Sequence, residues 1–252
     1  MNPYANVART LQESLSLSLS PIAVCITSSV PEGVPTFQGQ APAGCLFWQE
    51  AAARGPFATS TPDHELCAIG VHTLHMVAPA SSNKSELGQL LKVMADMEYV
   101  REEDVPNIPV LEQETKHVVY APLAETPLPP DVVILFVHSQ QGLIITEAVQ
   151  QVEPDVPPTL GRPACAVIPQ VVNTARAALS LGCCGARAYL NALTDDIALW
   201  AFPGSKVERY AERIAALAKA NSVLGEFHTL RRKEVEAGLK PTVAESLSRL
   251  ES

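Results

Sequence analysis

The sequence contains two pairs of cysteines, and each pair lies in a similar stretch of chain. Cys45 and Cys67 are 22 positions apart, and Cys165 and Cys183 are 18 apart. An apolar run rich in β-branched residues precedes each stretch at a distance. A chain that repeats a motif can bring both copies to one pseudo-twofold seam. We therefore expect the four thiols to meet between two related halves, where they would form a metal or cluster site.

The pattern along the chain predicts a mixed α/β fold. Apolar, β-branched runs indicate strands, and apolar residues at helical spacing indicate helices. Because strands and helices alternate throughout, we expect a single globular unit over residues 1–252, with possible pseudo-repeated halves at 1–116 and 117–252. Predicted strands lie at 21–27, 57–61, 117–123, 131–137 and 197–202. Predicted helices lie at 45–54, 66–76, 85–100, 140–151 and 171–181, with others near both ends and from 205.

Composition limits the kinds of partner that this chain can have. Its 252 residues are 47% hydrophobic and 18% charged, which is typical of a globular protein with a large core. The net charge is −9 and no long basic run is present, so nucleic acid is not expected as a partner. No signal peptide or membrane span is recognisable. We expect a cytoplasmic protein with reduced thiols, and the sequence does not indicate its oligomeric state.

Cys67 follows an Asp63-His64 pair that suits the start of a helix. A thiol in the first turn would have its pKa lowered by the helix dipole. His64 and Cys67 also have a spacing that can bind zinc or iron. The alternative is that Asp63 only caps the helix, His64 is solvated and Cys67 fills the core.

Glycines on both sides of the Cys183-Cys184 doublet allow the backbone to approach a bulky ligand closely. Arg187 would then offer a planar guanidinium to a carboxylate or phosphate. The alternative is a tight turn with Arg187 in a surface ion pair. Which of Cys183 and Cys184 would be a ligand stays open.

The remaining candidates are three cysteines, two histidines and two aromatic residues. Cys45 and Cys165 each open a predicted helix, a position that stabilises a thiolate. Cys25 lies inside a strand and is expected in the core. His72 and His75 lie one helical turn apart, a spacing that can bind a metal but is also common on the solvated face of a helix. Phe47 and Trp48 are expected as pocket walls, and the alternative is that they belong to the core.

Several short motifs follow one another along the chain. They are Gly44-Cys45-x-Phe47-Trp48, Asp63-His64-x-x-Cys67-x-Ile69-Gly70, Tyr120-x-Pro122-Leu123 before Asp131-Val132-Val133, Ser180-Leu181-Gly182-Cys183-x-Gly185-x-Arg187-x-Tyr189, and Ala220-Asn221-x-x-Leu224-x-x-Phe227-His228-x-x-Arg231. In this order they resemble an uncharacterised prokaryotic family, the domain of unknown function 169. The resemblance runs over nearly the whole chain and implies no reaction. It implies that Cys45, Cys67, Cys165 and Cys183 are the pattern cysteines, whereas a second cysteine at 184 departs from the pattern.

Three functions fit these residues. The first is a 4Fe–4S protein with the four pattern cysteines as ligands, a redox or substrate-binding role, and His64 or Arg187 orienting the substrate. The second is a metal-free enzyme with a thiolate nucleophile, either Cys67 with His64 or Cys183 with Arg187. The third is a structural zinc site or a small-molecule binding module without catalysis. The expected partner is a small-molecule substrate or an electron-transfer protein.

Overall fold

The computed structural model describes residues 2–77, 83–154, 157–160 and 163–250. Its strands are β1 (Ile22–Thr27), β2 (Phe57–Ser60), β3 (His117–Pro122), β4 (Val132–His138), β5 (Thr159–Leu160), β6 (Ala178–Ser180) and β7 (Ile197–Pro203). Its α-helices are α1 (Tyr4–Leu15), α2 (Leu46–Arg54), α3 (Thr61–His64), α4 (Ala68–Thr73), α5 (Asn83–Asp96), α6 (Ser139–Val152), α7 (Val167–Thr174), α8 (Cys184–Tyr189), α9 (Val207–Glu236) and α10 (Val243–Ser248). The described residues also form the 3₁₀ turns η1 (Glu102–Asn107), η2 (Leu123–Glu125), η3 (Ala164–Ala166) and η4 (Gly204–Lys206).

The described strands form one sheet in the order β2-β3-β1-β4-β7-β6-β5. At its centre β1 and β4 run antiparallel, with Ala23 opposite Val133. Outward from this centre, the order β1-β3-β2 on one side matches β4-β7-β6 on the other, and all of these pairings are antiparallel. The mixed α/β fold is thus confirmed. The matching order agrees with a pseudo-twofold axis at the centre, whereas the division into two repeated halves stays a prediction.

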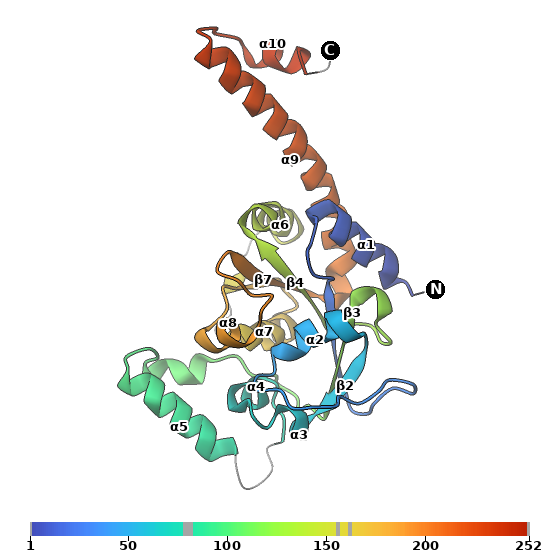
Figure 1. The fold of residues 1–252 in the computed structure, drawn as a ribbon, viewed down its shortest axis with the longest axis vertical. Coiled ribbons are helices and arrows are strands. Elements are labelled where there is room, and N and C mark those ends of the chain that lie inside the picture. The colour runs from blue at the N-terminus through green and yellow to red at the C-terminus, as the bar shows by residue number, and fades with distance from the viewer. Residues whose placement is uncertain (1, 78–82, 155–156, 161–162, 251–252) are drawn as a thin grey trace.

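Helices cover both faces of the sheet (Figure 1). On one face α2, α4, α7 and α8 pack against alternate strand residues such as Val24, Tyr120 and Ile134. On the other face α1, α6 and α9 pack against the intervening residues, including Val133 and Trp200. The central strands are therefore buried on both faces, which explains why β4 reads as a continuous apolar run. All four pattern cysteines belong to the first face.

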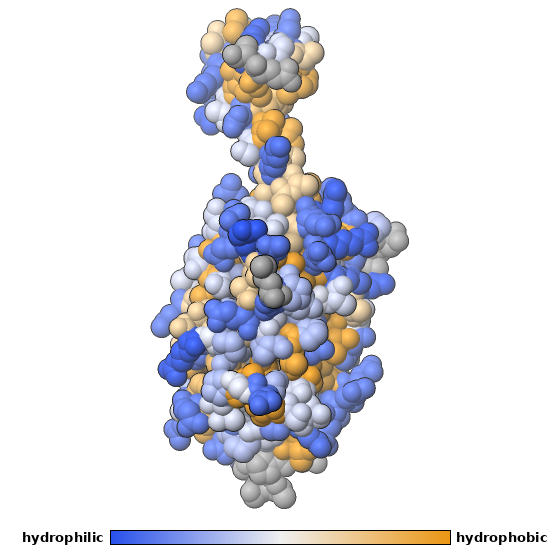
Figure 2. All heavy atoms as spheres, turned by 90° about the vertical axis from the view of Figure 1, so that its right-hand side faces the viewer, coloured by the Kyte–Doolittle hydropathy of each residue, from blue (hydrophilic) through white to orange (hydrophobic). Residues whose placement is uncertain are grey.

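Helix α9 starts on the body, against α1 and α6, and then extends away from it. Figure 2 shows this extension as a separate knob on a narrow neck. At its far end α10 folds back, and the buried Glu234 accepts a hydrogen bond from Ser246 at 2.8 Å. The Thr242 side chain caps α10. Although α9 has 30 residues, no helix in the described part of the chain is both long and apolar enough to cross a membrane.

The prediction of one helix over 171–181 is wrong. Helix α7 starts earlier, at Val167, and ends at Thr174 because Ala175 adopts a left-handed conformation with φ of 50°. The chain then enters strand β6 at Ala178. The strand pairs with β7, and this tertiary contact decides the structure of a segment whose local pattern also fits a helix.

Candidate functional site

The four pattern cysteines lie at the starts of four different helical segments. Cys45, Cys67 and Cys183 are the residues immediately before α2, α4 and α8. Cys165 lies in η3, which leads directly into α7. Each of the four thiols interacts electrostatically with the other three, so the fold brings all of them to one place. Cys45 and Cys165 are buried, and Cys67 and Cys183 are partly buried.

Hydrogen bonds from the protein already hold three of these sulfurs. The backbone N–H groups of Gly44 and Gly70 donate to the sulfur of Cys67. The N–H of Ala186 donates to Cys183 Sγ at 3.4 Å. Cys165 has a side-chain hydrogen bond with the fully buried Thr73, whose hydroxyl donates its proton to the Gly70 carbonyl at 3.2 Å. The backbone donors at Cys67 and Cys183 stabilise negative charge on a sulfur, so these two positions are prepared for thiolates.

Burial has the opposite effect and dominates in the protein without a ligand. It raises the pKa of the Cys45, Cys67 and Cys165 thiols above their usual range. The neighbouring thiols add to the increase because like charges repel. The prediction that the helix dipole lowers the pKa of Cys67 is therefore wrong. Short helix α4 does not compensate for the loss of water around the sulfur.

This burial predicts how the stability of the metal-free protein depends on pH. An exposed cysteine ionises near pH 9, whereas these buried thiols keep their protons above it. Their contribution to stability is complete below that pH and is lost as pH rises, by about 1.4 kcal/mol per pH unit for each thiol. We expect the free energy of unfolding, measured with urea at several pH values, to fall above pH 9. For Cys165→Ala this free energy should fall less steeply with pH. A slope equal to that of the wild type would contradict the burial of the Cys165 thiol.

His64 lies beside Gly44, next to the cysteine site, and is completely buried. The Thr59 hydroxyl donates to the Val118 carbonyl, so its oxygen accepts the proton on His64 Nε2 at 3.0 Å. Burial lowers the pKa of His64 to about 3, which keeps the ring neutral. Its Nδ1 has no hydrogen-bond partner. A Cβ atom placed on Gly44 would lie 3.0 Å from this nitrogen. His64 therefore supports the Gly44 backbone, and the expectation of a solvated ring is wrong.

Arg187 binds backbone oxygens of its own loop. Its guanidinium donates to the carbonyls of Thr194 and Leu181, each at 2.6 Å, and to that of Ile197 at 3.3 Å. These hydrogen bonds connect the segment after Cys183 to the start of β7. A cavity lies beside the cysteines, and neither Arg187 nor His64 is among the described residues that line it. In this structure both side chains position the cysteine loops, and a role in orienting a substrate stays a prediction.

The other candidate residues lie apart from the four pattern cysteines or differ from them in burial. Cys183 interacts with the remaining three pattern cysteines, whereas Cys184 is exposed. Cys25 belongs to a different cluster of the core, as expected. His75 Nδ1 lies 2.8 Å from the carbonyl oxygen of Leu111. Among the described residues, no group of three or more His, Cys, Asp or Glu side chains is placed to hold a metal ion as it stands.

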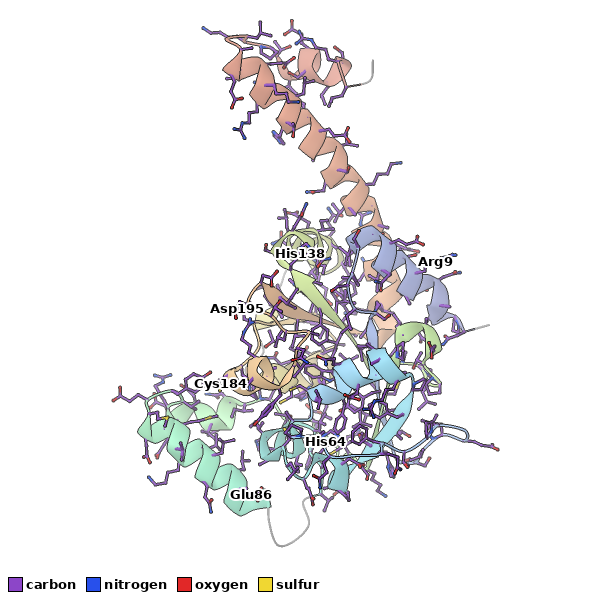
Figure 3. All side chains as sticks on the ribbon, viewed as in Figure 1. Arg9, His64, Glu86, His138, Cys184 and Asp195 are labelled. Carbon is purple, nitrogen blue, oxygen red and sulfur yellow. The ribbon has the colours of Figure 1, made fainter. Side chains whose placement is uncertain are left out.

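A cavity of about 820 Å³ opens beside the cysteines. All four pattern cysteines and Cys184 line it on one side. The other side is formed by α5 and the segment that continues into η1, which lie away from the sheet (Figures 1 and 3). Phe47 and Trp48 were expected as walls of this cavity. Instead they are fully buried in the core and do not line it.

Sequence reasoning missed several residues of the site. The pKa of buried Tyr120 is raised by loss of solvent and by Cys165, Cys67 and Cys45, so its phenol lies near their sulfurs. Its ring stacks on Phe47 with centroids 5.4 Å apart. The α5 wall was also missed, because an amphipathic helix gives no sign of which cavity it covers. Gly44 and Gly70, which lie close to Cys45 and Cys67 in the sequence, are the only local sign of the backbone N–H donors.

Comparison with known proteins identifies the family. A family profile described as an uncharacterised ArCR group, domain of unknown function 169, matches residues 10–213. The chain therefore belongs to that family, as its motifs indicate. The match contains all four pattern cysteines and ends within α9, before the 220–231 motif and α10. No curated protein and no solved structure was found to match the chain.

Proposed function

We propose that this protein is a 4Fe–4S protein whose cluster is held by Cys45, Cys67, Cys165 and Cys183. The observation that carries the proposal is the meeting of four thiols from four helix starts at one cavity. Four thiolates are the usual ligand set of such a cluster. Bound there, the cluster would supply one-electron transfer.

The chemistry of the donor set supports a cofactor at this place. Buried thiols that raise one another's pKa lose their protons near neutral pH only when a cation compensates the charge of the thiolates, as metal binding does. A single tetrahedral zinc ion, with Zn–S bonds near 2.3 Å, needs sulfurs roughly 3.8 Å apart. A core of four irons places its thiolates farther apart because the irons and sulfides lie between them. The four thiols come from four separate helix starts, which suits a core that reaches between them.

The chain's own residues would tune such a site. The N–H groups of Gly44 and Gly70 on Cys67, and of Ala186 on Cys183, would place partial positive charge at the sulfurs. Hydrogen bonds to the ligating sulfurs favour the reduced form and raise the reduction potential. Buried Tyr120 closes the site on the side of the sheet. Water would therefore reach it from the cavity and not from the core.

The test is to purify the full chain without oxygen and to measure iron, acid-labile sulfide, zinc and the visible spectrum. We expect about four irons and four sulfides per chain together with broad visible absorption. A colourless protein with one zinc would overturn the proposal in favour of a structural site. A colourless protein without metal, even after reconstitution with iron and sulfide, would overturn it in favour of thiol chemistry.

A further inference from the structure

We propose that the cavity beside the cysteines binds a neutral, mainly apolar small molecule, held between the sulfur-lined wall and α5. This inference deepens the proposed function, on which it rests for the role of the ligand, because it names the class of molecule that would meet the cluster. Its evidence is separate and consists of the shape, the side chains and the charges of the opposite wall.

The wall that faces the cysteines is apolar. Helix α5 contributes Leu90, Leu91 and Met94, and the segment after it contributes Val100 and Ile108. Leu90 is 38% exposed although it belongs to the apolar face of the helix. Side chains of this kind gain free energy when an apolar ligand removes them from water, by about 25 cal/mol per Å² of buried surface.

Aromatic rings stand on both sides of the cavity. Tyr99 follows α5, and Tyr189 is the last residue of α8, the helix that starts after Cys183. Both rings are exposed, at 43% and 47%. Figure 3 shows Cys184, at the other end of α8, on the side toward η1 and α5. Rings on facing walls favour a ligand with a flat or hydrophobic surface.

The cavity offers no free charge among its described lining residues. Arg101 and Asp104 are the charged ones, and they bind each other through two hydrogen bonds of 2.7 Å. Glu103 adds a second ion pair to Arg101 at 2.9 Å. An anionic ligand would have to compete with both carboxylates for this guanidinium. The lining therefore discriminates against anions, and Asn107 provides a polar group for orientation.

The size of the cavity agrees with this class. Its volume of about 820 Å³ falls within the range of sites for small organic ligands, roughly 300–1,000 Å³. An inorganic core would occupy the end where the four sulfurs lie. The end under α5 would remain, and most of the side chains that line it are apolar. A ligand there would lie directly against the cysteine site.

The experiment uses the iron-containing full chain and two fluorescent dyes that differ mainly in charge. The neutral dye is N-phenyl-1-naphthylamine, and the anionic one is its sulfonated analogue 8-anilinonaphthalene-1-sulfonate. Binding is measured by equilibrium dialysis, because a coloured cluster would quench fluorescence. We expect saturable binding of the neutral dye, at least roughly tenfold tighter than that of the anion.

Two substitutions on the same helix provide the matched comparison. Met94→Glu places a carboxylate on the cavity wall, whereas Val93 is 49% exposed and does not line the cavity. Met94→Glu should weaken neutral-dye binding about tenfold or more, and Val93→Glu should leave it unchanged. Equal binding by the two variants, or tighter binding of the anion, would overturn the inference. Iron content is measured on every sample, so a wild-type chain without iron contradicts the proposed function and leaves the dye result to be judged separately.

Discussion

Replacing Cys165 with alanine is expected to remove most of the iron from the protein. Cys165 is buried, and it interacts with each of the other three thiols. Loss of second-sphere partners alone lowers metal affinity by about 10–100-fold, so loss of a ligand should lower it at least tenfold. The measurement is iron and sulfide per chain after anaerobic purification, together with the visible spectrum.

Cys184→Ala is the matched control. Cys184 lines the same cavity and directly follows Cys183, but it is exposed and has no resolved interaction with the other thiols. The Cys184→Ala variant should retain its iron, whereas the Cys183→Ala variant should lose most of it. Equal iron in both variants would contradict the assignment of Cys183. The melting temperatures of the metal-free proteins should agree within a few degrees, which separates loss of a ligand from loss of the fold.

The sequence was sufficient to predict the mixed α/β fold and the four cysteines that meet. The residues around the four cysteines repeat along the chain, and each cysteine lies next to a helical pattern. The correspondence between the two pairs is therefore visible in the sequence. Cys25 was separated from them by its place within a strand, and the structure buries it in another cluster. Short-range patterns of this kind survive in the fold because they depend on neighbouring residues.

The features that were missed depend on contacts between distant segments. Tyr120 reaches the sulfurs because β3 pairs with β1 and passes under α2. The 171–181 segment divides into a helix and a strand because β7 offers an edge to residue 178. The shifted pKa values of His64 and Cys67 follow from burial. None of these contacts leaves a local pattern, since each depends on how the sheet is ordered.

Gly70→Ala is expected to damage the cysteine site from its backbone side. A Cβ atom on Gly70 would lie 2.9 Å from Cys67 Sγ, which is too close for carbon and sulfur. The sulfur would have to turn away from the N–H groups of Gly44 and Gly70 that now donate to it. We expect a loss of about 1–3 kcal/mol in the free energy of unfolding, as for other overpacked sites, and a shifted reduction potential or reduced iron.

Gly88→Ala supplies the comparison, because Gly88 is also helical but has no atom within 4 Å of its would-be Cβ. Alanine is the better helix former by about 1 kcal/mol, so this variant should be at least as stable as the wild type. Both substitutions gain the same helix propensity, and the difference between them isolates the contact with Cys67. If Gly70→Ala matched Gly88→Ala in stability, iron and potential, then the backbone around Gly70 would not hold the sulfur. The cysteine site would then owe its geometry to the four helix starts alone.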